Sequence, residues 1–387
     1  MQPRHARLRY QIIAFALARL AINTGHRMIY PFLPTIARGL NVERTVIAQA
    51  VSVRSALGFF SPIFGALANR RGSKIALLIG AGLFTAAMAL VTISPTYPAL
   101  VAALVIASAG KLIYDPAVQV YLGERVHYTQ RGFAIAITEL SWSGAFLIGM
   151  PVIGWLIDRS GQWQAPFPLL TALGIAAIIL LWLVVPPEDS TKRRPMPLMQ
   201  GIRLVLAHPP ALAGLATGFF ISASNETISI IYGAWLEDAF AMQVTALGLS
   251  ALVIGIAELA GESSVAGFVD RIGKRRAVAL GIGSNALAAL LLPVFGSGQI
   301  GALIGLFLFF ITFEFALVSS LPLMTELLPA ARATLMAGNV TAYSGGRMLG
   351  ALIGDPLFTM GLLANCTTAA IFDILALMAL LLFIRQE

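Results

Sequence analysis

The sequence predicts an all-α integral membrane protein with twelve transmembrane helices in two pseudo-symmetric six-helix bundles. Three observations predict this class. First, 58% of the 387 residues are hydrophobic and only 11% are charged, whereas a soluble domain carries roughly 25% charged residues. Second, apolar stretches recur at close to the roughly 20 residues that a helix needs to cross a bilayer. Third, polar motifs in the first half of the chain return at corresponding positions in the second half.

Hydropathy places the candidate spans in the following order: 10–36, 46–66, 75–94, 98–122, 133–156, 167–185, 211–236, 246–266, 277–296, 299–325, 334–358 and 362–384. The joins between them are short and rich in Gly, Pro or charge. One central segment is long, polar and rich in proline. We therefore expect an N-terminal bundle at 1–185, a cytoplasmic linker at 186–210 and a C-terminal bundle at 211–387.

Lys and Arg are distributed unequally between the two sets of joins. Alternate joins, the chain ends and the central linker hold most of them, and the other joins hold only Arg38, Arg44 and Arg159. Cytoplasmic loops carry this excess of cations, so we expect both termini in the cytoplasm and a bacterial inner membrane as the location. The net charge of +8 is spread over short breaks, which argues against a nucleic-acid partner.

Chemistry of the enzymatic kind is not apparent in the sequence. Cys366 is the single cysteine, and the four histidines show no metal-ligand spacing with another His or Cys. No phosphate-binding loop of the GxxxxGK[ST] kind is present. We therefore expect no enzyme activity, no metal and no cofactor, with an ion gradient as the energy source.

Two polar loops repeat each other. Residues 65–74 read GALANRRGSK and residues 266–275 read AGFVDRIGKR. Glycine permits a tight turn with positive φ, and the cations fix the loop at the cytoplasmic face. Internal repeats of this kind are typical of transporters whose binding site lies near the midplane between two related bundles.

With these residues, the chain resembles the major facilitator superfamily. Its signature loop is matched by the first copy at Gly65, Leu67, Arg70, Gly72 and Lys74, and by the second at Asp270, Arg271, Gly273, Lys274 and Arg275. The resemblance implies the major facilitator fold and a loop that latches one state of alternating access. Asn69 stands where the family has Asp, so we expect a weaker latch there and a larger share for Asp270. Gly144, Gly149, Pro151 and Gly154 resemble the fifth-helix pattern of family antiporters.

Polar residues at membrane depth are functional candidates by default because they are expensive to place there. Asn23, Arg27 and Tyr30 share one helical face with Arg19. The predicted substrate-binding residues are Asn23, Arg27, Tyr30, Arg54, Lys111, Tyr114, Asn225, Tyr343 and Arg347. Lys111 and Asp115 are four residues apart, so they can pair on their own helix.

The intramembrane carboxylates are candidates for proton coupling. Glu226 and Glu314 are the first candidates, because desolvation favours the protonated form of a carboxyl. Asp115 and Glu139 are further candidates. Glu258 and Glu262 lie four apart in span 246–266, and Glu262 is interpreted as a partner for a loop arginine. A competing interpretation is that these charges pair across the bundles and only hold the halves together.

The best functional interpretation is a monomeric secondary active transporter that moves a small organic compound, amphipathic and anionic compounds included, by proton-coupled efflux. The alternatives are proton-coupled uptake of an organic anion and lipid transport on the same fold. A membrane enzyme or receptor is disfavoured, because the intramembrane charges spread over eight predicted spans, as in a cavity lining, rather than converging near one surface.

Overall fold

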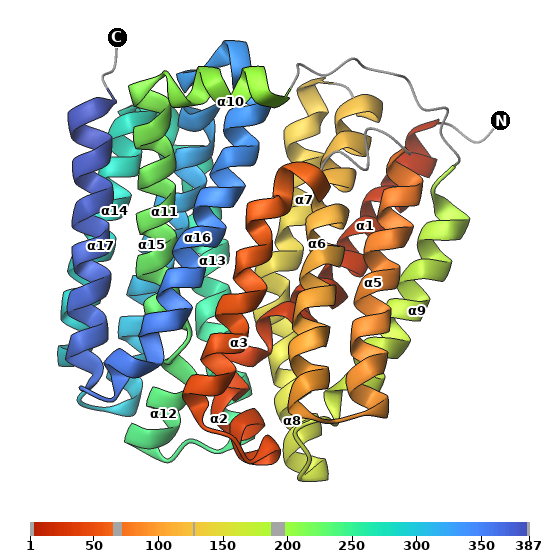
Figure 1. Cartoon of the computed structure of the whole chain (residues 1–387), viewed down its shortest axis with the longest axis vertical. Helices are drawn as coiled ribbons and strands as arrows, with labels where there is room; N and C mark the ends of the chain where they lie inside the picture. The colour runs from red at the N-terminus through yellow and green to blue at the C-terminus, as the bar shows by residue number, and fades with distance from the viewer. Residues whose placement is uncertain (1–3, 65–71, 127, 187–197, 385–387) are drawn as a thin grey trace.

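The computed structural model describes residues 4–64, 72–126, 128–186 and 198–384, except for the side chains of 4–7, 128–133, 135, 136, 198, 266 and 270. Every regular element in these ranges is helical. Helices of the first half lie on one side of the molecule and helices of the second half on the other (Figure 1).

The first half contains α1 (Arg4–Arg27), α2 (Ile29–Leu40), α3 (Arg44–Ala56), the 3-10 turn η1 (Leu57–Phe60), α5 (Ser73–Ile93), α6 (Tyr97–Arg125), α7 (Tyr128–Gly144), the π-helical turn η2 (Ala145–Gly149), α8 (Met150–Ser160) and α9 (Pro166–Val184). The second half contains α10 (Leu198–Leu206), α11 (Pro209–Ser229), α12 (Tyr232–Phe240), α13 (Val244–Ile272), α14 (Lys274–Phe295), α15 (Gln299–Leu327), η3 (Pro329–Ala331), α16 (Arg332–Phe358) and α17 (Leu362–Phe383).

Each predicted span coincides with one helix or with consecutive helical segments. Among the described residues, nine helices are long and apolar enough to cross a membrane, or ten if the segments 199–206 and 209–240, bent by 91°, form one span. The span predicted at 211–236 belongs to this tenth, and the spans predicted at 10–36 and 334–358 are helical but fall outside all ten. These two carry Arg19, Arg27 and Arg347, so the polar residues that weaken the hydropathy signal are themselves site candidates.

Two helices are interrupted at corresponding places in the two halves. α1 gives way to α2 at Met28, and α11 gives way to α12 at Ile230 and Ile231. Interrupted helices at matching positions of a repeat commonly mark the substrate site of a transporter. Gly233 of α12 packs against the backbone of α2, where an added Cβ would lie 2.5 Å from the Pro31 carbonyl oxygen. The two interruptions therefore face each other across the interface between the halves.

The interface between the halves is formed chiefly by α3 with α16, by α8 with α13 and by α2 with α12. At the end where α2, α8 and α12 lie (Figure 1), ion pairs join Arg38 to Glu237 and Arg44 to Asp238, the latter at 2.6 Å. α10 and the beginning of α1 lie at the opposite end (Figure 1). The halves are thus tied together by charge at the end remote from α10.

Candidate functional site

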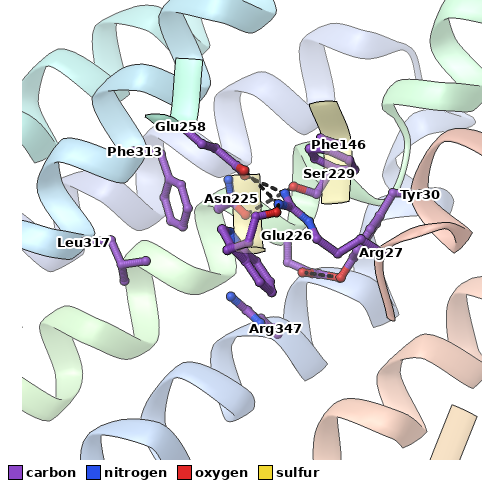
Figure 2. Close-up of a pocket in the computed structure, with 11 residues that line it drawn as sticks. Arg27, Tyr30, Phe146, Asn225, Glu226, Ser229, Glu258, Phe313, Leu317 and Arg347 are labelled. Carbon is purple, nitrogen blue, oxygen red and sulfur yellow. Dashed lines mark hydrogen bonds and ion pairs between the residues drawn. The ribbon is translucent and has the colours of Figure 1, made fainter. Parts of the chain in front are cut away.

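The centre of the site is an ion pair that crosses the interface. Arg27, the last residue of α1, donates to Glu258 of α13 from two nitrogens, at 2.7 and 2.5 Å, and both side chains are buried. Arg27 also donates to the Trp142 carbonyl at 2.9 Å, and its guanidinium lies 3.5 Å from the Phe146 ring centroid and 4.1 Å from that of Trp142. Figure 2 shows this side chain reaching from one half toward the acid of the other.

A second contact across the interface involves Glu226. The Tyr30 hydroxyl of α2 donates to the Glu226 carboxylate of α11 at 2.9 Å (Figure 2), and Arg54 donates to the same hydroxyl oxygen at 3.1 Å. Arg54 is held on its other side by the His26 carbonyl at 2.6 Å. Glu226 is 2% exposed. A buried carboxylate of one half is therefore stabilised by a tyrosine of the other half.

These groups surround a small cavity of about 20 Å³, enough for one water molecule. Its lining residues are Arg27, Tyr30, Trp142, Phe146, Asn225, Glu226, Ser229, Glu258, Phe313, Leu317 and Arg347. Five of the predicted site residues are among them: Arg27, Tyr30, Asn225, Glu226 and Arg347. The structure is therefore that of a nearly closed site, and a larger ligand requires the halves to move apart around it.

Asn225 and Arg347 bring hydrogen-bond donors to this cavity. The Ser229 hydroxyl donates to the Asn225 side-chain oxygen at 3.1 Å, which turns the amide nitrogen away from it. That nitrogen is buried and has no partner within the described part of the chain. Arg347 lies 5.5 Å from the Trp142 ring centroid and, within the same ranges, forms no ion pair with a carboxylate. Both groups can receive an acceptor from a ligand.

Four other predicted residues form a separate network inside the first half. Asp115 pairs with Arg19 at 2.9 Å and with Lys111 at 2.8 Å, Glu139 pairs with Arg19 at 2.7 Å, and Lys111 donates to the Asn23 side-chain oxygen at 2.5 Å. The predicted pairing of Lys111 with Asp115 is confirmed. The two acids and two bases compensate one another, and none of them lines the cavity.

The remaining predicted substrate residues lie outside the cavity lining. Tyr114 is 0% exposed and donates to the Phe15 carbonyl at 3.1 Å. The Tyr343 hydroxyl lies 3.0 Å from that of Ser320. Arg54 lies behind Tyr30 and reaches the cavity only through it. In this conformation Tyr114 packs helices together, whereas Arg54 positions a lining residue.

Glu314 of α15 lies close to the central ion pair. Its position depends on Gly261 of α13, where an added Cβ would lie 2.9 Å from the Glu314 Cβ and 2.8 Å from the Ile311 carbonyl oxygen. Such a close helix approach requires glycine. Glu314 is 3% exposed, and its Oε2 has no partner among the described residues. The acid predicted as a proton carrier is therefore buried and only partly satisfied.

The repeated loops are described in part. Gly72 and Gly273 adopt nearly the same backbone, with φ of 85° and 86°, as expected for turns that need positive φ. Arg271 is exposed at the end of α13. Gly65, Asn69 and Arg70 lie outside the described residues, as does the side chain of Asp270. The latch predicted at these loops therefore stays a prediction.

Sequence reasoning did not assign Trp142, Phe146, Ser229, Phe313 and Leu317 to the site, and it gave Glu258 no role. Apart from Glu258, these are residue types common in any span, so their identity carries little signal. The helix-five pattern offered one clue: Gly149 lies where an added Cβ would be 2.4 Å from the Thr24 hydroxyl oxygen. The π-helical turn and this glycine bring α1 against the helix that carries Trp142 and Phe146. In the described ranges no group of three His, Cys, Asp or Glu could hold a metal ion.

Comparison with known proteins agrees with this architecture. The family model of the Major Facilitator Superfamily matches residues 15–351. The chain is 23% identical to the MFS-type transporter YbcL of Bacillus subtilis, over 98% of this chain and 96% of that protein. It is 27% identical to the class C tetracycline resistance protein of Escherichia coli, over 69% of each chain. The fold is similar to that of a bacterial homologue of the human lysosomal transporter Spinster, solved inward-facing and unoccupied, with a TM-score of 0.72, 14% identity and coverage of 99% and 95% of the two chains. The chain belongs to the Major Facilitator Superfamily and is a transporter, not an enzyme.

Proposed function

We propose that this transporter exports a small organic compound in exchange for protons, by alternating access to the cavity between its halves. The observation that carries the proposal is Glu226. Its buried carboxylate belongs to one half, and its hydrogen-bond donor, Tyr30, belongs to the other. When the halves rock apart, the carboxylate loses that donor, and a buried carboxylate without a donor is costly. Taking up a proton relieves this cost, so proton binding and conformation are linked.

The proposed cycle uses this linkage. A proton from the outside neutralises Glu226, and protonation weakens its hold on the cationic groups near it or on a substrate. The proton leaves to the cytoplasm after the protein reopens on that side, and the substrate is carried in the opposite direction. Under the positive-inside rule the end that holds α10 is cytoplasmic, and the ion pairs at α2, α3 and α12 close the outer end.

Two observations support export over uptake. A relative named for tetracycline resistance matches more than two thirds of the chain. The glycine and proline pattern that resembles the antiporter branch coincides with η2, beside the central arginine. A monomer in the inner membrane, with the proton gradient as its energy source, completes the proposal.

The test is transport by the purified protein in liposomes with an imposed pH gradient, screened over cationic, neutral and anionic organic compounds. We expect accumulation of at least one compound against the direction of proton flow. Glu226→Gln and Glu314→Gln should abolish the pH-driven component, whereas Glu237→Gln, at the outer end, should retain most of it. Full pH-driven transport by both glutamine variants would remove these acids from the proton path.

A second candidate function is uptake of an organic anion together with a proton. It is favoured by the donors that Arg347 and the Asn225 amide bring to the cavity, because both await an acceptor. A proton on Glu226 would remove a competing negative charge, so the anion and the proton would bind together. The liposome assay separates the two candidates by sign: an inward proton gradient drives anion uptake in this case and compound export in the first.

A further inference from the structure

The two partners of the central ion pair differ in what they retain if the halves separate. Arg27 keeps the Trp142 carbonyl and the faces of Trp142 and Phe146, all from its own half. Glu258 accepts hydrogen bonds from Arg27 alone, as far as the described residues extend. Separation would therefore leave the cation partnered and the carboxylate bare. A bare buried carboxylate takes up a proton rather than bear the desolvation cost.

The surroundings of Glu258 are acidic. Titratable and charged groups from several helices face Glu258 or the acids next to it, Glu262 and Glu314. They are Arg27 of α1, Tyr30 of α2, Glu139 of α7, Glu226 of α11, Tyr232 of α12 and Arg347 of α16. The Tyr232 hydroxyl is buried and has no partner within the described ranges. Arg347 lines the same cavity as Glu258, but within the described ranges neither Arg347 nor Tyr232 donates a hydrogen bond to it.

A line of carboxyls leads away from Glu258. Glu262 lies one turn further along the same face of α13, toward the end of the bundle that holds α10. The Glu262 and Glu314 carboxyls are in mutual contact, so Glu262 has an intramembrane acid as a partner; its pairing with a loop arginine stays a prediction. Gly261 places Glu314 between the levels of Glu258 and Glu262. Glu262 is the least buried of the three acids.

From this geometry we infer that Glu258 is a proton-binding site whose protonation releases Arg27 and so unlocks the two halves, and that Glu314 and Glu262 carry the proton between Glu258 and the α10 end of the bundle. The inference rests on the proposed proton coupling and adds its coupling device. In the structure Glu258 is paired with Arg27, the arrangement expected after the proton has left along this path. The proton returns to Glu258 when the halves part, and Arg27 stays with Trp142.

The test follows conformation without any substrate. Spin labels are attached to cysteines that replace Ser160 and Thr359, two exposed residues of opposite halves at the outer end. The native cysteine is removed by Cys366→Ala. The distribution of distances between the two labels is measured by pulsed EPR from pH 5 to 9. The wild-type distribution should shift as the pH falls. Glu258→Gln should give the low-pH distribution at every pH. The change in its distance distribution between pH 5 and 9 should be at least tenfold smaller than in the wild type. If the distance distribution of Glu258→Gln changed with pH as that of the wild type does, the inference would be overturned.

Two further variants cover the case in which Glu258→Gln does not fold. Arg27→Gln removes the other partner and should also fix the low-pH distribution, whereas a normal titration by this variant would again overturn the inference. Glu237→Gln is the matched control and should titrate as wild type. Failure of the coupling device is distinct from failure of the proposed function. In the first case liposomes show pH-driven transport while Glu258→Gln titrates normally. In the second, the distances titrate through Glu258 but no compound follows the gradient.

Discussion

The two halves of this transporter treat their buried charges differently. In the first half, Arg19, Lys111, Asp115 and Glu139 pair with one another and stay within that half. In the second half, Glu258 and Glu226 obtain donors from the first half, through Arg27 and Tyr30. The first set keeps its partners while the halves rock, and the second set loses them. We therefore expect the first set to govern stability and the second to govern conformation and proton binding.

The largest effect should come from breaking the self-contained network. Asp115→Asn leaves Arg19 and Lys111, both mostly buried, to share Glu139. Removing one partner of a buried pair costs about 3 kcal/mol, so we expect a marked drop in the thermal unfolding midpoint in detergent. In the fraction of the variant that still folds, the spin-label distance between Ser160 and Thr359 should respond to pH as in the wild type.

The control for this prediction removes the local pair together. Lys111→Met with Asp115→Leu deletes one cation and one anion and leaves Arg19 with Glu139. Replacing a buried pair by apolar residues is often close to neutral. The double variant should therefore unfold at a higher temperature than Asp115→Asn. If the two unfold alike, the network is not held by charge compensation.

A smaller effect is expected from removing the hydroxyl that crosses the interface. Tyr30→Phe leaves the Glu226 carboxylate without its hydrogen bond from the other half, and an unsatisfied buried acceptor costs about 2 kcal/mol. We expect Glu226 to stay protonated to higher pH, and the midpoint of pH-driven transport to move in the alkaline direction.

Tyr114→Phe is the matched control for Tyr30→Phe. Its hydroxyl donates to the Phe15 carbonyl within one half, so its loss should lower stability without moving the pH profile. Equal shifts of the profile in both variants would contradict the assignment of Glu226 as an acid that senses the interface.

The comparison also explains what the sequence could predict. The spans, the Lys111–Asp115 pair and the positive φ of Gly72 and Gly273 all follow from local rules: hydropathy, i to i+4 spacing and turn geometry. The partnership of Arg27 with Glu258 joins residues 231 positions apart and depends on how two bundles meet. No local pattern contains that information.

The same limit applies to the aromatic lining. Phe146 and Trp142 reach the site because η2 shifts the register of their helix and because α1 is interrupted next to Arg27. Pro31 and Pro151 have no N–H to donate to the carbonyls of Arg27 and Leu147, which favours interruptions at these places, but this local signal does not say which side chains then meet at the site. Glu258 could have been found from its charge at membrane depth, but its role required knowledge of which partner it loses.

The closed arrangement of the halves also depends on close packing of backbones at the interface. Gly248 of α13 faces α8, and an added Cβ would lie 2.7 Å from the Met150 carbonyl oxygen. Gly248→Ala would therefore overpack a contact between backbones, at a cost of about 1.5 kcal/mol to the closed arrangement. The spin-label distance at the outer end should lengthen in part of the population. Gly283→Ala has open space around its Cβ within α14 and should leave the distribution unchanged.

The smallest effect should come from the exposed ion pairs at the outer end. The Arg38 side chain is 60% exposed beside Glu237, and a solvated pair of this kind contributes about 0.5 kcal/mol. At low salt, Arg38→Gln should therefore change the ratio of closed to open protein by no more than about twofold to threefold. The difference from wild type should disappear as the salt concentration rises, because salt screens exposed pairs and leaves buried ones largely unaffected. The response to salt thus distinguishes this tie from the Arg27–Glu258 pair, which should respond to pH and hardly to salt. If Arg38→Gln opened the outer end as fully as Glu258→Gln, surface charge rather than the buried acids would hold the two halves together.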